Sequence, residues 1–176
     1  MKVFGLAGWS GSGKTTLVIW LIPALRARGI SVSTVKHAHH HFDVDKPGKD
    51  SYEHRQAGAQ EVVITSAERW ALMRELNGAP EPTVAELLER MHPVDLVLVE
   101  GFKREPHDKI EVFRAAGRRP PLCREDPHIV AVASDEPDGA TLDGIELPRL
   151  DLDDIEAIAD FIVAHCGLKT SAQGAA

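Results

Sequence analysis

Hydrophobic residues along the chain follow two periods, one typical of buried strands and one typical of amphipathic helices. Residues 2–7 form a short apolar run, which predicts a buried strand. In residues 16–28 the apolar side chains recur at helical spacing, which predicts a helix that ends at Gly29, a residue suited to the left-handed position after a helix. Residues 31–36 are short and β-branched, so these segments together predict a βαβ unit with a parallel crossover.

Further strand patterns follow in the second half of the chain. Residues 95–101, 109–113 and 129–133 are close to continuously apolar or alternating, and residues 147–152 can add a short edge strand. A last helix, which we expect Asp153 to cap, carries an apolar stripe that should pack on the sheet. The order of these elements predicts an α/β fold, doubly wound, with a mainly parallel sheet and helices on both faces.

The middle of the chain follows a different pattern. Residues 36–50 form a polar loop that is too long for a plain connection, and Asp50 or Ser51 is expected to cap a short helix after it. Two strand-like runs within about residues 60–78 predict a β-hairpin insertion, and residues 83–86 form a capping box that opens another helix. Because an apolar hairpin has an exposed edge, it favours either pairing with a second protomer or capping of its own sheet.

The length and composition indicate one globular domain. With 176 residues the chain can bury a core without metals or disulfides, so we assign residues 1–168 to a single domain and residues 169–176, which lack a core-forming pattern, to a loose tail. A net charge of −7 argues against a general nucleic-acid or membrane-surface binder. The two cysteines lack zinc or redox spacing, no export signal opens the chain, and no apolar run approaches the ~20 residues of a membrane span. We therefore expect a reduced, cytoplasmic protein.

Candidate chemistry begins in the segment between the first strand and the first helix. Residues 8–15 read Gly-Trp-Ser-Gly-Ser-Gly-Lys-Thr and fit the phosphate-binding pattern G-x-x-x-x-G-K-[ST], which requires this strand–loop–helix context. Backbone N–H groups of such a loop, and of the helix that follows it, surround phosphate oxygens. Lys14 would pair with the β/γ-phosphates and Thr15 would coordinate Mg²⁺. The residues assigned to this phosphate cradle are Gly8, Ser10, Gly11, Ser12, Gly13, Lys14 and Thr15.

Carboxylates at the ends of other segments can complete this site. Glu100 ends a buried strand, where a carboxylate is unfavourable unless it faces a cation; a P-loop Mg²⁺ would supply one, and a solvated strand end is the alternative. Asp43, Asp45 and Asp50 lie on the polar loop and could hold Mg²⁺ or orient the attacking water. We assign to catalysis Lys14, Glu100 and Asp43, and to the metal Thr15, Glu100 and Asp45.

The polar loop also carries four histidines, His37, His39, His40 and His41. Imidazole suits nickel and zinc, so a transition-metal site is one interpretation. Adjacent histidines on a loop rarely converge on one ion without further ligands. We therefore favour a loop that closes over the nucleotide or over an anionic substrate.

Two further sets of polar residues are open to alternative interpretations. Lys103, Arg104 and Lys109 follow the Glu100 strand and could meet phosphates of a partner molecule, although a solvated basic loop fits their residue types equally well. Asp135 ends the next apolar strand and could accept hydrogen bonds from the N1–H and 2-amino groups of guanine, which adenine cannot offer. The alternative for Asp135 is an aspartate that caps a turn.

Three segments together resemble one family. The P-loop at residues 8–15, the histidine–aspartate segment at residues 35–51 and the Val-Glu-Gly-Phe-Lys run at residues 99–103 are similar to the molybdopterin-guanine dinucleotide biosynthesis protein B family. The resemblance covers most of the chain and implies a P-loop NTPase fold. It also implies a GTP-binding, weakly hydrolysing, dimeric accessory protein that helps a partner nucleotidyltransferase attach GMP to molybdopterin. By position, it implies that phosphates and Mg²⁺ are held by Gly11, Gly13, Lys14, Thr15 and Thr16, with Glu100 as the Walker B acid.

The chain departs in two places from other nucleotide-binding proteins of this type. No N-K-x-D guanine motif occurs, and only Asp135 could correspond to its aspartate. Trp9 stands where related ATPases of the partitioning type carry a signature lysine, which disfavours an ATPase of that kind. The expected function is Mg-GTP binding with slow hydrolysis. The alternatives are a small-molecule or nucleoside kinase, a nickel- or zinc-insertion chaperone that uses the histidines, and a non-catalytic adaptor.

Overall fold

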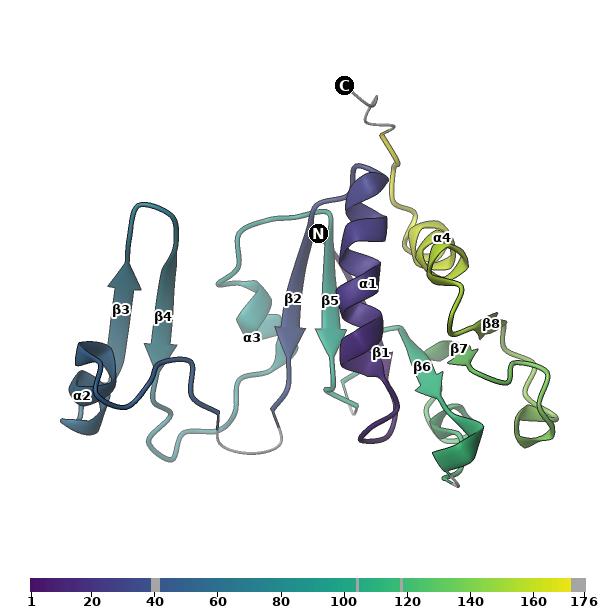
Figure 1. The fold of residues 1–176 in the computed structure, drawn as a ribbon, viewed down its shortest axis with the longest axis horizontal. Helices are drawn as coiled ribbons and strands as arrows, with labels where there is room; N and C mark the ends of the chain where they lie inside the picture. Colours follow the sequence, from purple (N-terminus) through teal and green to yellow (C-terminus); the bar gives the residue numbers. More distant parts are fainter. Residues whose placement is uncertain (39–41, 104, 118, 172–176) are drawn as a thin grey trace. The chain divides into compact units, whose positions relative to one another are not determined.

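The structure, a computed structural model, describes residues 1–38, 42–103, 105–117 and 119–171. Contacts divide the chain into two compact units (Figure 1), a larger one formed by Met1–His37 with Met91–Ala176 and a smaller one formed by Ala38–Arg90. The predicted roles of His39–His41 and Arg104 fall outside the described residues. The single-domain organisation stays a prediction.

The larger unit is built on a sheet of six strands. These are β1 (Lys2–Ala7), β2 (Val32–Lys36), β5 (Leu96–Glu100), β6 (Lys109–Phe113), β7 (Ile129–Ser134) and β8 (Arg149–Asp151). Their order is β2-β5-β1-β6-β7-β8 and every neighbouring pair is parallel, so the arrowheads of β2, β5 and β6 in Figure 1 point to the same edge. This arrangement confirms the predicted α/β fold. The carboxyl ends of β5 and β6 flank the loop that leaves β1, which is where open parallel sheets bind ligands.

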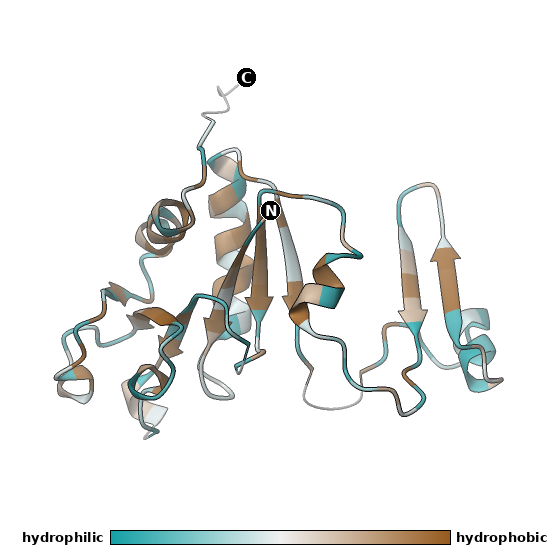
Figure 2. Ribbon diagram, turned by 180° about the vertical axis from the view of Figure 1, so that it is seen from behind, coloured by the Kyte–Doolittle hydropathy of each residue, from teal (hydrophilic) through white to brown (hydrophobic). Residues whose placement is uncertain are grey.

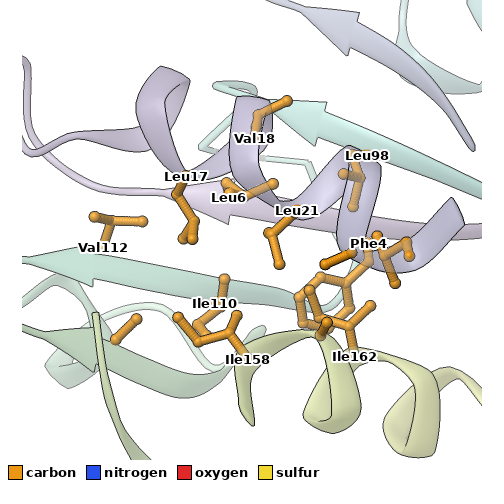
Figure 3. Packing of buried hydrophobic residues seen from close by; sticks show 14 of the residues in the cluster. Phe4, Leu6, Leu17, Val18, Leu21, Leu98, Ile110, Val112, Ile158 and Ile162 are labelled. Carbon is orange, nitrogen blue, oxygen red and sulfur yellow. The ribbon is translucent and has the colours of Figure 1, made fainter. Parts of the chain in front are cut away.

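One face of this sheet is covered by two helices, α1 (Lys14–Ala27) and α4 (Ile155–Cys166), which also pack against each other. Figure 3 shows Leu21 of α1 and Ile162 of α4 gathered with Phe4 of β1. These three side chains are completely buried, and burying a side chain of this kind contributes about 1.5–3 kcal/mol. The core therefore holds α1 firmly against β1 and fixes both ends of the loop between them.

The opposite face of the sheet carries a smaller apolar cluster. Its buried members are Phe113, Val132, Leu142 and Ile145. Leu142 belongs to the 3₁₀ segment η3 (Ala140–Leu142), so short turns contribute to this side, where the sequence pattern led us to expect a helix.

The ends of the two helices follow the predicted signals except at the start of α4. Gly29 follows α1 with a φ of 77°, as expected for a left-handed residue after a helix. The N-cap of α4 is Asp154, whose carboxylate accepts a hydrogen bond of 2.9 Å from the N–H of Ala157. The prediction that Asp153 caps this helix is wrong by one residue, because its own N–H donates to the Asp151 carboxylate at 2.9 Å and starts the turn earlier. Among the helices in the described segments, none is long and apolar enough to cross a membrane.

Two charged side chains of β6 are buried, although their residue types favour solvent. The ammonium of Lys109 donates to the carbonyl oxygen of Glu105 at 2.8 Å and lies 3.2 Å from a carboxylate oxygen of Asp126. The Glu111 carboxylate accepts backbone N–H groups at 2.7 and 2.9 Å from the start of the 3₁₀ segment η2 (Leu122–Arg124). Both interpretations of Lys109, as a phosphate contact and as part of a solvated loop, are wrong because its charge is satisfied inside the protein.

The smaller unit contains an antiparallel hairpin and two short helices. Its elements are α2 (Asp50–Gln56), β3 (Glu61–Thr65), β4 (Trp70–Arg74) and α3 (Val84–Leu88). The pairing of β3 with β4 confirms the hairpin predicted near residues 60–78, and the predicted capping box of residues 83–86 is present. The N-cap of α2 is Lys49, which makes no side-chain capping bond, so the predicted cap by Asp50 or Ser51 is wrong.

One face of the hairpin is apolar and exposed. Val63 lies opposite Leu72 and Thr65 lies opposite Trp70, so the four side chains share a face. Val63 is 63% exposed and Trp70 is 68% exposed. Figure 2 shows β3 with hydrophobic colouring as strong as that of the central strands of the larger unit. Two neighbouring cross-strand pairs therefore leave apolar surface in solvent.

Candidate functional site

The loop that joins β1 to α1 adopts a conformation that requires glycine. Gly8, Gly11 and Gly13 have φ values of 144°, 80° and 102°, a region that favours glycine. A Cβ atom on Gly8 would lie 2.6 Å from the carbonyl oxygen of Val112, so a side chain is also excluded by space. Within the described residues no side chain caps α1 at Gly13, which leaves the first N–H groups of the helix available to an anion.

The side chain of Lys14 lies across this loop. Its ammonium donates to the carbonyl oxygens of Gly8 at 3.0 Å and Trp9 at 2.9 Å. Partial burial lowers the pKa of Lys14, and the positive charges of Lys103 and Lys36 lower it further, while Glu100 acts in the opposite direction. A cation in surroundings that disfavour its charge is stabilised by an incoming anion.

The hydroxyl of Thr15 and the carboxylate of Glu100 meet at the edge of the sheet. Thr15 Oγ1 donates to Glu100 Oε1 at 2.6 Å, and the Glu100 side chain is only 13% exposed. The ammonium of Lys36 contacts both groups, at 3.1 Å from Thr15 Oγ1 and 3.2 Å from Glu100 Oε1. Strand pairing produces this contact, because Glu100 lies in register with Leu6 of β1 on one side and with Lys36 of β2 on the other.

Sequence reasoning did not identify Lys36 as a site residue. The available signal was its position at the carboxyl end of a predicted strand, next to the polar loop. Its importance depends on β2 being the neighbour of β5, and strand order is not visible in a hydrophobic pattern.

The backbone turns sharply immediately after Glu100. Gly101 has a φ of 94°, and a Cβ atom there would lie 2.8 Å from Cβ of His37. The His37 N–H donates to the Glu100 carbonyl oxygen at 2.9 Å, and its ring lies 4.9 Å from the ring of Phe102. The Val-Glu-Gly-Phe segment therefore brings the start of the histidine loop against the end of β5.

A second cation, Arg114, lies on the other side of the P-loop. Its Nε donates to the carbonyl oxygen of Ser12 at 3.1 Å, and its Nη1 lies 3.1 Å from Asp135 Oδ2. The other oxygen of Asp135 accepts the N–H of Ala115 at 3.3 Å. Asp135 therefore contacts the P-loop through Arg114. The sequence signal that was missed is a lone arginine directly after the β6 strand.

Trp9 anchors the P-loop to a neighbouring loop. Its indole Nε1 donates to the carbonyl oxygen of Pro120 at 2.9 Å. The ammonium of Lys103 and the guanidinium of Arg119 each lie 4.8 Å from its ring, within the range of cation–π attraction. The indole thus holds two cations close to the phosphate cradle.

The two aspartates assigned to catalysis and metal binding lie in the smaller unit, where both pair with Arg55. Arg55 Nη2 lies 2.7 Å from a carboxylate oxygen of Asp43 and 2.7 Å from one of Asp45, and its Nη1 lies 2.8 Å from Glu75. The hydrogen bonds that the Arg55 guanidinium donates to these carboxylates, with the one to Asp45 as the largest cause, raise the pKa of Arg55. Asp50 is the first residue of α2. The roles assigned to Asp43 and Asp45 stay predictions.

Comparison with known proteins shows the family to which this chain belongs. A family model described as Molybdopterin guanine dinucleotide synthesis protein B matches residues 3–135. The chain belongs to the MobB family. Within this MobB-family protein, the matched region contains the P-loop, Lys36, Glu100, Arg114 and Asp135.

Two curated relatives of this MobB-family chain are similar to it along almost their whole length. A molybdopterin-guanine dinucleotide biosynthesis adapter protein of Escherichia coli (strain K12) is 49% identical over 166 residues, which are 93% of this chain and 92% of that protein. A protein of the same name from Haemophilus influenzae is 44% identical over 92% of this chain and 88% of its own length.

Solved structures confirm the fold of the MobB-family chain. A crystal structure of molybdopterin-guanine biosynthesis protein B is 29% identical and superimposes with a TM-score of 0.71 over 93% of this chain and 99% of that one. The structure of Bacillus subtilis MobB, at 22% identity and a TM-score of 0.74 over 94% of this chain and 98% of that one, supports the fold alone. The P-loop α/β architecture predicted from the sequence is therefore confirmed.

Proposed function

We propose that this protein is an adapter of molybdopterin-guanine dinucleotide synthesis that binds Mg-GTP at the P-loop and hydrolyses it slowly. The observation that carries the proposal is the contact between Thr15 and Glu100 at the end of the glycine loop. A P-loop hydroxyl and a strand-end carboxylate are the protein ligands that a nucleotide-bound Mg²⁺ requires. The names of the two bacterial relatives support the pathway.

The residues present fit a magnesium ion. Thr15 and Glu100 offer hard oxygen atoms, and Mg²⁺ commonly takes one or two protein ligands together with water and substrate phosphates. The Lys36 ammonium lies within 3.2 Å of both oxygens, so they already converge on a positive charge. When bound, Mg²⁺ would neutralise charge on the β/γ-phosphates.

The chain's own groups supply the remaining steps of binding. Backbone N–H groups of the glycine loop and of the first turn of α1 would surround the phosphate oxygens. Lys14 would exchange the carbonyl oxygens of Gly8 and Trp9 for phosphate oxygens. Arg114, fixed by Asp135 and by the Ser12 carbonyl oxygen, would supply further positive charge beside Gly13.

Slow hydrolysis of GTP agrees with the ion pair that Asp43, the proposed catalytic aspartate, forms in the structure. Asp43 is paired with Arg55, and this ion pair occupies its carboxylate. Asp43 would therefore orient an attacking water only after release from Arg55. Asp45 would need the same release before it could hold a metal ion.

The proposal includes a homodimer and a nucleotidyltransferase partner that attaches GMP to molybdopterin. The exposed apolar face of the hairpin, formed by Val63, Leu72 and Trp70, supports self-association. Sedimentation equilibrium should show dimers for the natural protein and monomers for Leu72→Lys. A natural protein that stays monomeric at all concentrations argues against the dimer, whereas the nucleotide proposal would stand.

Calorimetric titration with Mg-GTP and with Mg-ATP tests the central proposal. We expect saturable binding of both triphosphates, with GTP bound more tightly. Binding of ATP that is equal or tighter would overturn the guanine assignment, and failure of both to bind would overturn the nucleotide proposal. Transfer of the γ-phosphate to an added nucleoside would instead identify a kinase.

A further inference from the structure

A pocket opens beside the P-loop in the larger unit. It has a volume of about 210 Å³ and lies between α1 and the segment that leads from β8 into α4. Gly13 and Thr16 form its end nearest the phosphate cradle. Its other lining residues are Leu17, Trp20, Arg114, Leu152, Asp153 and Ile155.

The position of this pocket suits the nucleoside part of a nucleotide. Phosphates held by the glycine loop lie at the start of α1, so the rest of the molecule must leave the cradle along one of its borders. The pocket begins at such a border, because Gly13 belongs to both the cradle and the pocket, and the lining residue Thr16 directly follows the cradle in the sequence. Its volume is below the ~300 Å³ typical of sites that enclose a complete small ligand, so it matches a purine ring whose phosphates lie outside.

Trp20 gives one wall of the pocket a flat aromatic surface. The side chain is 58% exposed, although an indole of this size is normally buried when it only stabilises a core. Aromatic side chains on which nucleobases stack bind every base, because each base has a π-face. Ile19 precedes Trp20 on α1 and is 60% exposed, but it does not line the pocket.

Asp153 gives the pocket an acceptor that the local structure does not use. The adjacent Asp154 caps α4, and Asp151 accepts the Asp153 N–H, so neighbouring carboxylates perform the local structural roles. Among the described residues, no group donates a hydrogen bond to the exposed Asp153 carboxylate. Guanine presents N1–H and its 2-amino group side by side, which matches two carboxylate oxygens, whereas adenine presents an acceptor at N1.

We propose that this pocket receives the purine ring of the bound nucleotide, with Trp20 stacked on the ring and Asp153 selecting guanine. This inference rests on the proposed nucleotide binding and assigns base recognition to a residue other than Asp135. Both carboxylate oxygens of Asp135 are engaged, one with Arg114 and the other with the N–H of Ala115. Asp135 is thus a positioning residue for Arg114.

Replacing the carboxylate of Asp153 with an amide tests whether this residue selects guanine. The probes are GTP and xanthosine triphosphate. Xanthine carries a carbonyl oxygen where guanine has the 2-amino group, so Asp153→Asn can donate to it while still accepting N1–H. We expect Asp153→Asn to lose about tenfold or more in affinity for GTP and to bind the xanthine nucleotide more tightly than GTP. Asp135→Asn is the matched control and should keep the natural order of preference.

The outcomes separate this inference from the function on which it rests. If Asp153→Asn still prefers GTP, or if Asp135→Asn shows the reversal, the assignment of Asp153 is overturned while GTP binding stands. If the natural protein binds no GTP, both are overturned. Circular dichroism of each variant would confirm that these exposed substitutions leave the fold intact.

A second pair of variants tests the stacking surface. Trp20→Ala should weaken GTP and ATP alike, by about five- to 100-fold, because stacking does not depend on the identity of the base. Ile19→Ala removes a neighbouring exposed apolar side chain outside the pocket and should leave both affinities unchanged. Equal effects of the two substitutions would overturn the role of Trp20.

Discussion

The cation at the glycine loop of the larger unit and the cation at the centre of the smaller unit have different partners. In the larger unit, Lys14 lies at the edge of the sheet and donates to two backbone carbonyl oxygens of the glycine loop. In the smaller unit, Arg55 is surrounded by Asp43, Asp45 and Glu75. The first arrangement leaves positive charge available to an anion, whereas the second balances its charge internally. The contrast supports the proposal that anions bind to the larger unit, whereas the smaller unit has an exposed apolar face.

Lys14→Ala tests the larger unit with the greatest expected effect. Removal of the ammonium should weaken Mg-GTP binding by about 100-fold or more, because a charge-assisted contact to the β/γ-phosphates is lost. Isothermal titration calorimetry measures the change. Lys169→Ala removes a lysine near the chain end and serves as the control. Comparable losses in the two variants would contradict a specific role for Lys14.

Glu100→Gln tests the proposed role of Glu100 as a metal ligand without a large change in the shape of its side chain. Glutamine preserves the shape of the side chain and can still accept the Thr15 hydroxyl, but it has no charge for a metal ion. GTP affinity in the presence of Mg²⁺ should fall by about tenfold or more, and the affinity in EDTA should change little. Titration of both proteins with and without the metal checks this. An equal loss under both conditions would argue against metal binding at Glu100.

His107 makes the larger unit sensitive to acid. Burial, with the charges of Lys109 and His128, lowers the pKa of His107 to about 4, so the native ring is neutral while the unfolded ring titrates near its ordinary value. Because the unfolded state binds the proton more readily, stability is lost as the pH falls from about 6.5 towards 4, by up to about 2–3 kcal/mol.

Urea unfolding of the natural protein and of His107→Asn at pH 7 and pH 5 measures this dependence. The natural protein should lose more stability between the two values than the variant does. Residual acid sensitivity from other groups is common to both proteins and cancels in the comparison. An identical loss in both would show that the His107 ring titrates normally in the native state.

Arg55→Lys tests the balanced charges of the smaller unit and has the smallest expected effect on the nucleotide site. Lysine keeps the charge but cannot hold three carboxylates with a planar fork. Mg-GTP affinity should stay within about twofold, whereas the rate of GTP hydrolysis should rise severalfold if Asp43 orients the attacking water. A phosphate-release assay gives the rate. No change in the rate, or a decrease, would argue against the catalytic role of Asp43.

The sequence was most informative where a feature is local. The strand, glycine loop and helix of residues 2–28 form a continuous signal, because glycine in the left-handed region and helical periodicity are both properties of neighbouring residues. The position of Glu100 at a strand end follows from one buried run. The hairpin could also be predicted, because its two paired strands, β3 and β4, follow one another directly in the sequence.

Features that depend on strand order or on buried partners could not be predicted in this way. Lys36 reaches Glu100 because β2 lies beside β5, and Arg114 reaches Ser12 because β6 lies beside β1. Lysine is normally exposed, and the burial of Lys109 depends on acceptors that only the folded chain brings together. The capping of α4 by Asp154 depends on the turn made at Asp151, which residue type alone does not reveal.

The contact of Lys36 with Thr15 and Glu100 affects the stability of the sheet edge when no ligand is bound. The largely buried Glu100 carboxylate has a counter-charge supplied by Lys36, so the sheet edge keeps its electrostatic balance without any bound ion. For the proposed binding of Mg-GTP, we therefore expect that loading and emptying the site require no refolding of the surrounding strands. The scaffold would then stay the same through repeated cycles of the proposed nucleotide binding.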